Sequence, residues 1–115
     1  TKAGLRKNLL TPLLQALPFM HIRFLNHRPA ATAPSGTYRF IPKEAASWGI
    51  SIQRGIADLS DSSQNHAEVT GEGEAFIFHT TGRKSWEKAE REQLLSINGK
   101  RKQMEELLAA LAVTY

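Results

Sequence analysis

The spacing of hydrophobic residues changes twice along this 115-residue chain, and these changes limit the folds open to it. Near the N-terminus, Leu5, Leu9, Leu13 and Leu17 recur every fourth residue, as on one face of a helix. Residues 19–80 instead carry short alternating or wholly apolar segments typical of strands, and helical spacing returns after residue 85. This order predicts an α+β fold. We expect a four- to five-stranded, mainly antiparallel sheet with an N-terminal helix and one or two C-terminal helices.

Prolines and glycines set the expected element boundaries in the first half. Thr11-Pro12 has the composition of a helix start, and Pro18 ends or interrupts the helix. Apolar and polar residues alternate over Phe19–Leu25, which predicts a strand with His21 on its polar face. The composition of residues 26–36 is that of a loop, and Thr37–Ile41 predicts a second strand.

The middle of the chain predicts the rest of the sheet. Gly49–Leu59 reads as one long strand with a bulge at Gly55. His66–Thr70 and Glu74–Thr80 flank a glycine-rich turn and predict a hairpin. Because both faces of residues 75–78 are apolar, we expect the second strand of this hairpin to be central in the sheet.

Two helical segments follow. Ser85 is a suitable N-cap for a helix that runs to about Ser96. Asn98-Gly99 then turns the chain, and a second helix is expected from about Lys100. The apolar stripe of this second helix consists of Met104, Leu107, Leu108 and Leu111.

Composition excludes several classes of protein. The absence of cysteine rules out disulfide scaffolds, thiolate zinc sites and cysteine nucleophiles. No apolar run approaches the roughly 20 residues that cross a bilayer. We expect one domain over residues 1–115, with the alternative that the chain, which begins at Thr1, is a fragment of a longer protein. A cytoplasmic location is expected, although an acid-free, basic N-terminal region is also typical of organelle transit peptides.

Charge is divided into blocks along the sequence. Residues 1–57 hold eight Lys and Arg and one carboxylate, whereas residues 58–82 hold five carboxylates and neither Lys nor Arg. Residues 83–115 are again net basic. A basic surface that is separate from an acidic one attracts polyanions, because Lys and Arg bind phosphates with release of counterions.

Clustered cations therefore predict a non-enzymatic nucleic-acid-binding or nucleoprotein-associated module, for DNA or RNA. Lys100–Lys102 precede a helix whose first amides would assist in binding phosphate. Arg83-Lys84 lie beside Trp86, and Tyr38 and Phe40 share a strand face suited to base stacking. The predicted phosphate contacts are Arg23, His27, Arg28, Arg39, Lys43, Arg83, Lys84, Lys100, Arg101 and Lys102.

Two alternatives remain open. In the first, the chain is a protein-interaction or assembly domain, in which acidic and basic surfaces or the C-terminal apolar stripe meet a partner or a second copy. In the second, it is a small nuclease in which His66, Glu68 and His79 supply acid–base chemistry and Arg83 holds the phosphate. No histidine spacing matches a metal site, and Gly71-x-Gly73 lacks the lysine of a phosphate-binding loop. We expect neither metal nor cofactor.

Overall fold

The computed structural model describes residues 7–27 and 34–111. It confirms the predicted α+β class: an N-terminal helix precedes a five-stranded, mostly antiparallel sheet, and helices close the chain. In chain order, the elements are α1 (Lys7–His27), β1 (Gly36–Pro42), β2 (Trp48–Gln53), β3 (Ile56–Ser60), β4 (Ala67–Gly71), α2 (Gly73–Thr80), α3 (Trp86–Arg91), β5 (Leu95–Gly99) and α4 (Arg101–Leu111).

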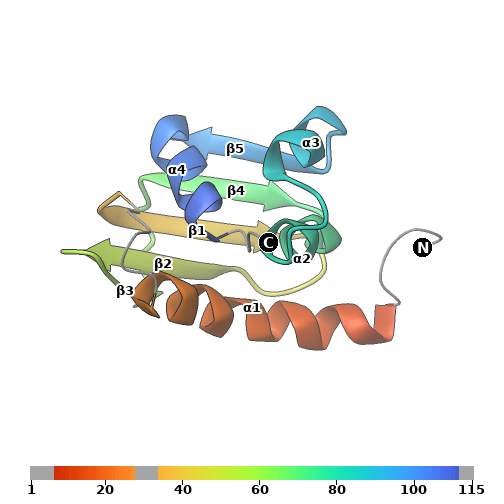
Figure 1. The fold of residues 1–115 in the computed structure, drawn as a ribbon, viewed down its shortest axis with the longest axis horizontal. Coiled ribbons are helices and arrows are strands. Elements are labelled where there is room, and N and C mark those ends of the chain that lie inside the picture. Colours follow the sequence, from red (N-terminus) through yellow and green to blue (C-terminus); the bar gives the residue numbers. More distant parts are fainter. Residues whose placement is uncertain (1–6, 28–33, 112–115) are drawn as a thin grey trace.

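The sheet has the strand order β3-β2-β1-β4-β5. All neighbouring strands are antiparallel except β1 and β4, which run parallel and pair Phe40 with Val69. A parallel neighbour needs a crossover, and here the β2–β3 hairpin and the loop after it return the chain to the other side of β1. Figure 1 shows α1 along the β2–β3 side of the molecule and α4 over the β4–β5 side.

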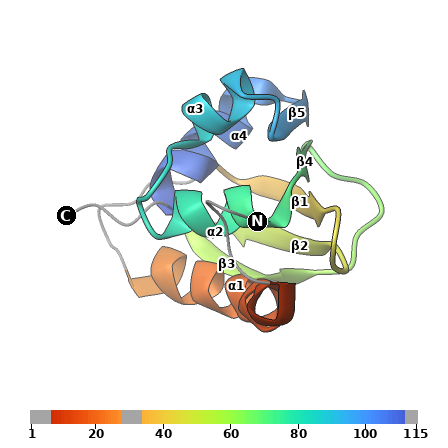
Figure 2. The ribbon, with the colours of Figure 1, turned by 90° about the vertical axis from the view of Figure 1, so that its right-hand side faces the viewer.

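The helices cover one face of the sheet and leave the other uncovered (Figure 2). On the covered, inner face, the side chains of Tyr38, Phe40, Ile50 and Val69 are fully buried. On the outer face, the strands present mainly polar side chains, among them Thr37, Arg39, Ser51, Glu68, Thr70 and Ser96. The core is therefore a single layer between the sheet and helices α1, α2 and α4.

The predicted strand Phe19–Leu25 is wrong, because helix α1 continues through Pro18 to His27. The apolar stripe continues with it: Leu14, Leu17 and Leu25 are buried, and the next helical position on the same face is His21. Phe19, on the opposite side, is 66% exposed. Burial of this stripe against the sheet outweighs the hydrogen bonds that Pro12 and Pro18 cannot donate.

The predicted single strand Gly49–Leu59 is divided into β2 and β3 by a two-residue turn. Arg54 and Gly55 both have positive φ, at 54° and 77°. Two consecutive left-handed residues form the type I′ turn, whose twist suits a tight hairpin. Gly55 is thus a turn residue and not the predicted bulge.

The predicted hairpin of His66–Thr70 with Glu74–Thr80 is also wrong. The first segment is β4, but the second is helix α2, whose Ala75, Phe76, Ile77 and His79 are all buried. A helix buried on several sides has no amphipathic pattern, so its sequence resembles a central strand. The carboxylate of Glu44 accepts hydrogen bonds of 3.0 and 3.2 Å from the Gly73 amide and so caps this helix.

The C-terminal third follows the prediction in part. Ser85 caps α3 as expected, since its hydroxyl accepts from the Lys88 amide. The helix ends at Arg91, however, and Leu95–Gly99 forms the edge strand β5 in place of the predicted helical continuation to Ser96. Helix α4 then begins at Arg101, and the predicted stripe of Met104, Leu107, Leu108 and Leu111 is buried.

Candidate functional site

Three aromatic side chains meet on the inner face of the sheet. Phe40 of β1 stacks on Trp48 at the start of β2, with ring centroids 5.4 Å apart. Phe76 of α2 lies 6.2 Å from Phe40 and meets Trp48 edge-on at 5.9 Å. All three side chains are buried, so α2 and the first two strands of the chain enclose an apolar cluster.

Helix α1 adds a histidine to this cluster. The His21 ring lies 5.4 Å from Phe40 and 6.0 Å from Trp48, and the residue is 1% exposed. Its Nε2 is 2.9 Å from Oγ1 of Thr80, which is itself buried in α2. Burial, helped by nearby His79, lowers the pKa of His21 to about 3, so the ring is neutral at physiological pH.

Two nitrogen atoms in this region have no hydrogen-bond partner among the described residues: His21 Nδ1 and Trp48 Nε1. Asn65 Oδ1, in the loop before β4, is the remaining buried side-chain atom of this kind in the described part of the chain. A buried polar group without a partner costs about 1–3 kcal/mol, and native proteins leave few of them. We call His21, Phe40, Trp48, Phe76 and Thr80 the aromatic site.

His79 lies in the same helix as Thr80, but its hydrogen bonds are all made within the protein. Its Nδ1 accepts from the Trp86 amide at 3.1 Å, which leaves Nε2 to donate to the Leu108 carbonyl at 2.6 Å. Burial lowers the pKa of His79 despite the raising effect of the hydrogen bond to Leu108. This histidine connects α2 to α3 and α4, and its role is structural.

The residues predicted to bind phosphate lie on several elements and on both faces of the sheet. Arg23 and His27 are exposed on α1, Arg83 precedes α3, Lys100–Lys102 are at the start of α4, and Arg28 lies outside the described residues. Arg39 is on the outer face, where its guanidinium donates to the Ser47 hydroxyl at 3.0 Å and the Ser62 carbonyl at 3.1 Å.

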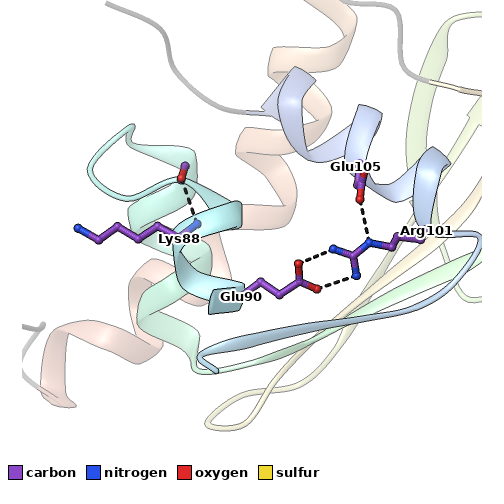
Figure 3. A network of polar contacts seen from close by, with 5 residues as sticks. Lys88, Glu90, Arg101 and Glu105 are labelled. Carbon is purple, nitrogen blue, oxygen red and sulfur yellow. Dashed lines mark hydrogen bonds and ion pairs between the residues drawn. The ribbon is translucent and has the colours of Figure 1, made fainter. Parts of the chain in front are cut away.

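Several of these cations are paired with carboxylates. Lys43 pairs with Glu72 at 3.1 Å, and Lys84 pairs with Glu92 at 2.8 Å. Arg101 makes a two-pronged contact with Glu90 of α3 and a 2.8 Å hydrogen bond to Glu105 (Figure 3). The pair of Lys43 with Glu72 joins the basic first block of the sequence to the acidic block, whereas the other pairs lie within residues 83–115 and neutralise cations there.

The predicted His66–Glu68–His79 grouping is not assembled. His66 is exposed before β4, where its Nδ1 accepts a 3.1 Å hydrogen bond from the Thr37 amide. Glu68 projects from the outer face between the buried residues Ala67 and Val69. His79 is on the other side of the sheet, in the helix layer, and both of its ring nitrogens are hydrogen-bonded.

An open groove on the outer side of β2 and β3 is a weaker candidate site. Its lining mixes exposed apolar and charged side chains, including Ile56, Leu59, Arg54 and Asp58. Residues 7–27 and 34–111 contain no cluster of side chains able to hold a metal ion. Within those same ranges, no helix combines the length and hydropathy of a membrane span.

No protein-family model matches this chain, and no curated protein matches its sequence. Solved structures do match it. A structure described as the ubiquinone synthesis protein UbiJ-SCP2 has a TM-score of 0.69 and 15% identity, over 87% of this chain and 93% of that chain. Sterol carrier protein 2 like 2 from Aedes aegypti has a TM-score of 0.64 and 12% identity, over 84% of this chain and 94% of that chain. This chain has the sterol carrier protein 2 fold.

The sterol carrier protein 2 fold also occurs as part of a larger protein. The stereoselective inverting sec-alkylsulfatase Pisa1 from Pseudomonas sp. matches 96% of this chain with only 17% of its own length, at a TM-score of 0.60 and 10% identity.

These matches correct the functional prediction. Several neighbours bear the name of sterol carrier protein 2 and none is named as a nucleic-acid-binding protein, so the predicted nucleic-acid-binding module is wrong, and the assembly-domain and nuclease alternatives are likewise without support. Sequence reasoning missed the aromatic site because it assigned His21 to the polar face of a strand. The signal that identifies the site is the helical spacing of Leu14, Leu17, His21 and Leu25 across Pro18.

Proposed function

We propose that this chain binds a largely hydrocarbon small molecule of the lipid class at the aromatic site. The observation that carries the proposal is the pair of buried nitrogens, His21 Nδ1 and Trp48 Nε1, without partners among the described residues. Small-molecule sites are mostly apolar and hold a few polar groups that orient the ligand. In a core that serves packing alone, nearly all buried polar atoms are paired.

The names of the fold neighbours support this proposal. A sterol carrier and a ubiquinone synthesis protein both have names that refer to molecules made largely of hydrocarbon with small polar groups. The name of the sec-alkylsulfatase refers to an alkyl chain with a polar end. An apolar layer between helices and a sheet, with isolated polar atoms inside it, has the chemistry that such molecules require.

The test is an NMR titration of the ¹⁵N-labelled protein with three ligands of equal chain length: 1-dodecanol, 2-dodecanone and dodecanoate. We expect saturable shifts at the amides around His21, Phe40 and Phe76 and at the indole N–H of Trp48. Binding of one molecule also raises the unfolding midpoint, because it stabilises only the folded state.

Two control variants report on other apolar surfaces. Ile56→Ser alters the outer groove, and Phe19→Ser alters the exposed side of α1, where Ile56 and Phe19 are 65% and 66% exposed. We expect both variants to bind like the original chain. Shifts confined to either surface, or the absence of binding by all three ligands, would rule out the proposed function.

A further inference from the structure

The two edge strands of the sheet, β3 and β5, differ in how their outward-facing backbone groups are satisfied (Figure 1). On β3, the side-chain amide of Asn26 accepts from the Ala57 N–H at 2.8 Å and donates to the Ala57 carbonyl at 3.0 Å, as a neighbouring strand would. Two residues further on, the Leu59 amide donates to the carboxylate of Asp58 at 3.0 Å. The outward amides of this edge are therefore already bonded to side chains.

Hydrogen bonds at the two ends of the β4–β5 ladder show which residues of β5 face away from β4. At one end, the Lys100 amide donates to the His66 carbonyl at 2.9 Å. At the other end, the Glu72 amide donates to the Leu94 carbonyl, also at 2.9 Å. Hydrogen-bonded and non-hydrogen-bonded pairs alternate in an antiparallel ladder, so every second residue between these ends points its backbone groups outward.

The outward-facing residues of β5 are Leu95, Ile97 and Gly99. Their amides and carbonyls have no hydrogen-bond partner in the described part of the chain, in contrast to the capped amides of β3. Ser96 and Asn98, between them, are exposed, and Ile97 is half-buried. A row of unpaired backbone donors and acceptors on an accessible edge is a template on which a further strand can pair.

We propose that β5 pairs with β5 of a second copy of this chain, antiparallel and about a twofold axis at Ile97. In this register Ile97 faces its counterpart and Leu95 faces Gly99, so the outward groups of both strands all find partners. A register shifted by two residues leaves one outward residue of each strand unpaired. The surface differs from the assembly surfaces expected from the sequence, because it uses neither the charge blocks nor the apolar stripe of α4, which is buried.

The capped edge at β3 limits the assembly to two copies. If both edges were open, β5 of one copy could pair with β3 of the next, and such a head-to-tail contact generates filaments when it does not close. Asn26 prevents this pairing, because its side chain already holds both outward groups of Ala57. With one open edge on each copy, pairing through β5 forms a closed dimer.

The side chains are compatible with this register. On the outer face of the sheet, Ser96 of each copy lies opposite Asn98 of the other, and both side chains are neutral and able to hydrogen-bond. On the helix-covered face, Ile97 meets its counterpart, while Leu95 meets Gly99, which has no side chain to crowd it. Like charges opposite one another destabilise paired strands, and β5 contains no charged residue.

Sedimentation equilibrium of the full chain over a concentration series measures the pairing. We expect a reversible monomer–dimer equilibrium without larger species, and a weak one, since two strands of 5 residues make a small contact. In the ¹⁵N-labelled protein, the amides of Leu95, Ile97 and Gly99 should shift with concentration and gain protection from hydrogen exchange. A chain that stays monomeric up to about 1 mM, or shifts confined to other amides, overturns the inference.

Two double variants test the register. Ser96→Lys with Asn98→Lys places two ammonium groups opposite each other at two points of the dimer and should weaken dimerisation about tenfold. Ser96→Asp with Asn98→Lys places opposite charges at the same points and should dimerise at least as tightly as the original chain. Both side chains are exposed, so neither double variant alters the core.

Ile56→Ser is the matched control at the other edge of the sheet, because Ile56 is exposed on β3 and lies outside the proposed contact. Its dimerisation should equal that of the original chain. Loss of the dimer in this variant, or equal affinities of the two double variants, overturns the inference. The dimer forms without ligand, so the outcome is independent of the ligand titration that tests the proposed function.

Discussion

Arg54 and Gly55 show how two backbone conformations determine a change of direction in the chain. Both have positive φ, which places them in the left-handed region that asparagine and glycine tolerate better than arginine. A Cβ added at Gly55 would meet no atom within 4 Å, so only backbone strain opposes substitution there. The turn is therefore a site where conformational preference can be measured without packing effects.

We expect Arg54→Asn to stabilise the protein by about 0.5–1 kcal/mol and Gly55→Ala to destabilise it by about 1–2 kcal/mol. Urea denaturation of the two variants and the original chain measures both effects. Gly49→Ala provides a contrast, because its Cβ would lie 2.5 Å from the Ser60 carbonyl oxygen and would clash. An unchanged midpoint for Gly55→Ala would show that the turn has another conformation in solution.

The roles of single residues are predictable from residue type in some cases and not in others. Ser85 was identified as an N-cap because its residue type matches its role, and the structure confirms the hydrogen bond. Arg-Gly is not among the common type I′ pairs, so the β2–β3 turn was missed. The same limit applies to Trp48 and His21, because a residue's type does not reveal whether tertiary packing leaves its polar atom paired.

Helix α1 illustrates how a whole element departs from its local preferences. It contains Pro12 and Pro18, each of which removes a backbone donor from a helix of 21 residues. Pro18 is buried, whereas Pro12 is exposed and contributes little packing. The helix persists because its apolar face is buried on the sheet, and not because of propensity.

Pro12→Ala should therefore stabilise the protein, by at most about 3 kcal/mol, since it restores one helical donor and relieves the proline's clash with the preceding turn. The gain is reduced by the greater freedom of alanine in the unfolded chain. Urea denaturation monitored by circular dichroism tests this expectation. Gln15→Ala, at another exposed position of α1, controls for helix propensity alone. A lower midpoint for Pro12→Ala would mean that the proline is needed for the course of α1.

The elements that were predicted correctly are those with local signals. The strand at residues 37–41 alternates, and α4 has a clear apolar stripe. Phe19–Leu25 of α1 and Glu74–Thr80 of α2 are predicted as strands, because short segments rich in apolar residues fit either structure. Which one forms is decided by burial against distant parts of the chain. The parallel pairing of β1 with β4 is equally non-local and has no sequence signature.

At the scale of the whole molecule, the fold divides the chain into a polar outer face and an apolar layer covered by helices. Cations that cluster in the sequence are paired with carboxylates in space: Lys43 of the basic block with Glu72 of the acidic block, and Lys84 with Glu92 within the last block. A functional prediction based on the linear charge map was therefore misdirected. The chemistry of the candidate site instead lies inside the layer, where α1, α2 and the sheet place neutral polar atoms among aromatic rings.

That layer also makes global stability dependent on pH. Both buried histidines have lowered pKa values in the folded state, His21 at about 3, so the unfolded chain binds more protons below its histidine pKa of about 6.5. The contribution of the two neutral histidines to the free energy of unfolding is fully present above about pH 6.5. It is lost as the pH falls below that value. For His21 alone, the free energy of unfolding should decrease by about 2 kcal/mol between pH 7 and pH 5.

Urea denaturation at pH 7, 6 and 5 measures this loss, and His21→Phe tests its origin. Phenylalanine keeps a ring beside Phe40 and Trp48 but cannot be protonated, so the variant should lose clearly less stability than the original chain over this interval. Histidine ring signals in the folded original chain provide a second reading, because those of His21 should not titrate between pH 7.5 and pH 5. An equal loss in both proteins, together with a titrating His21, would place this ring in water and would contradict its burial between α1, α2 and the sheet.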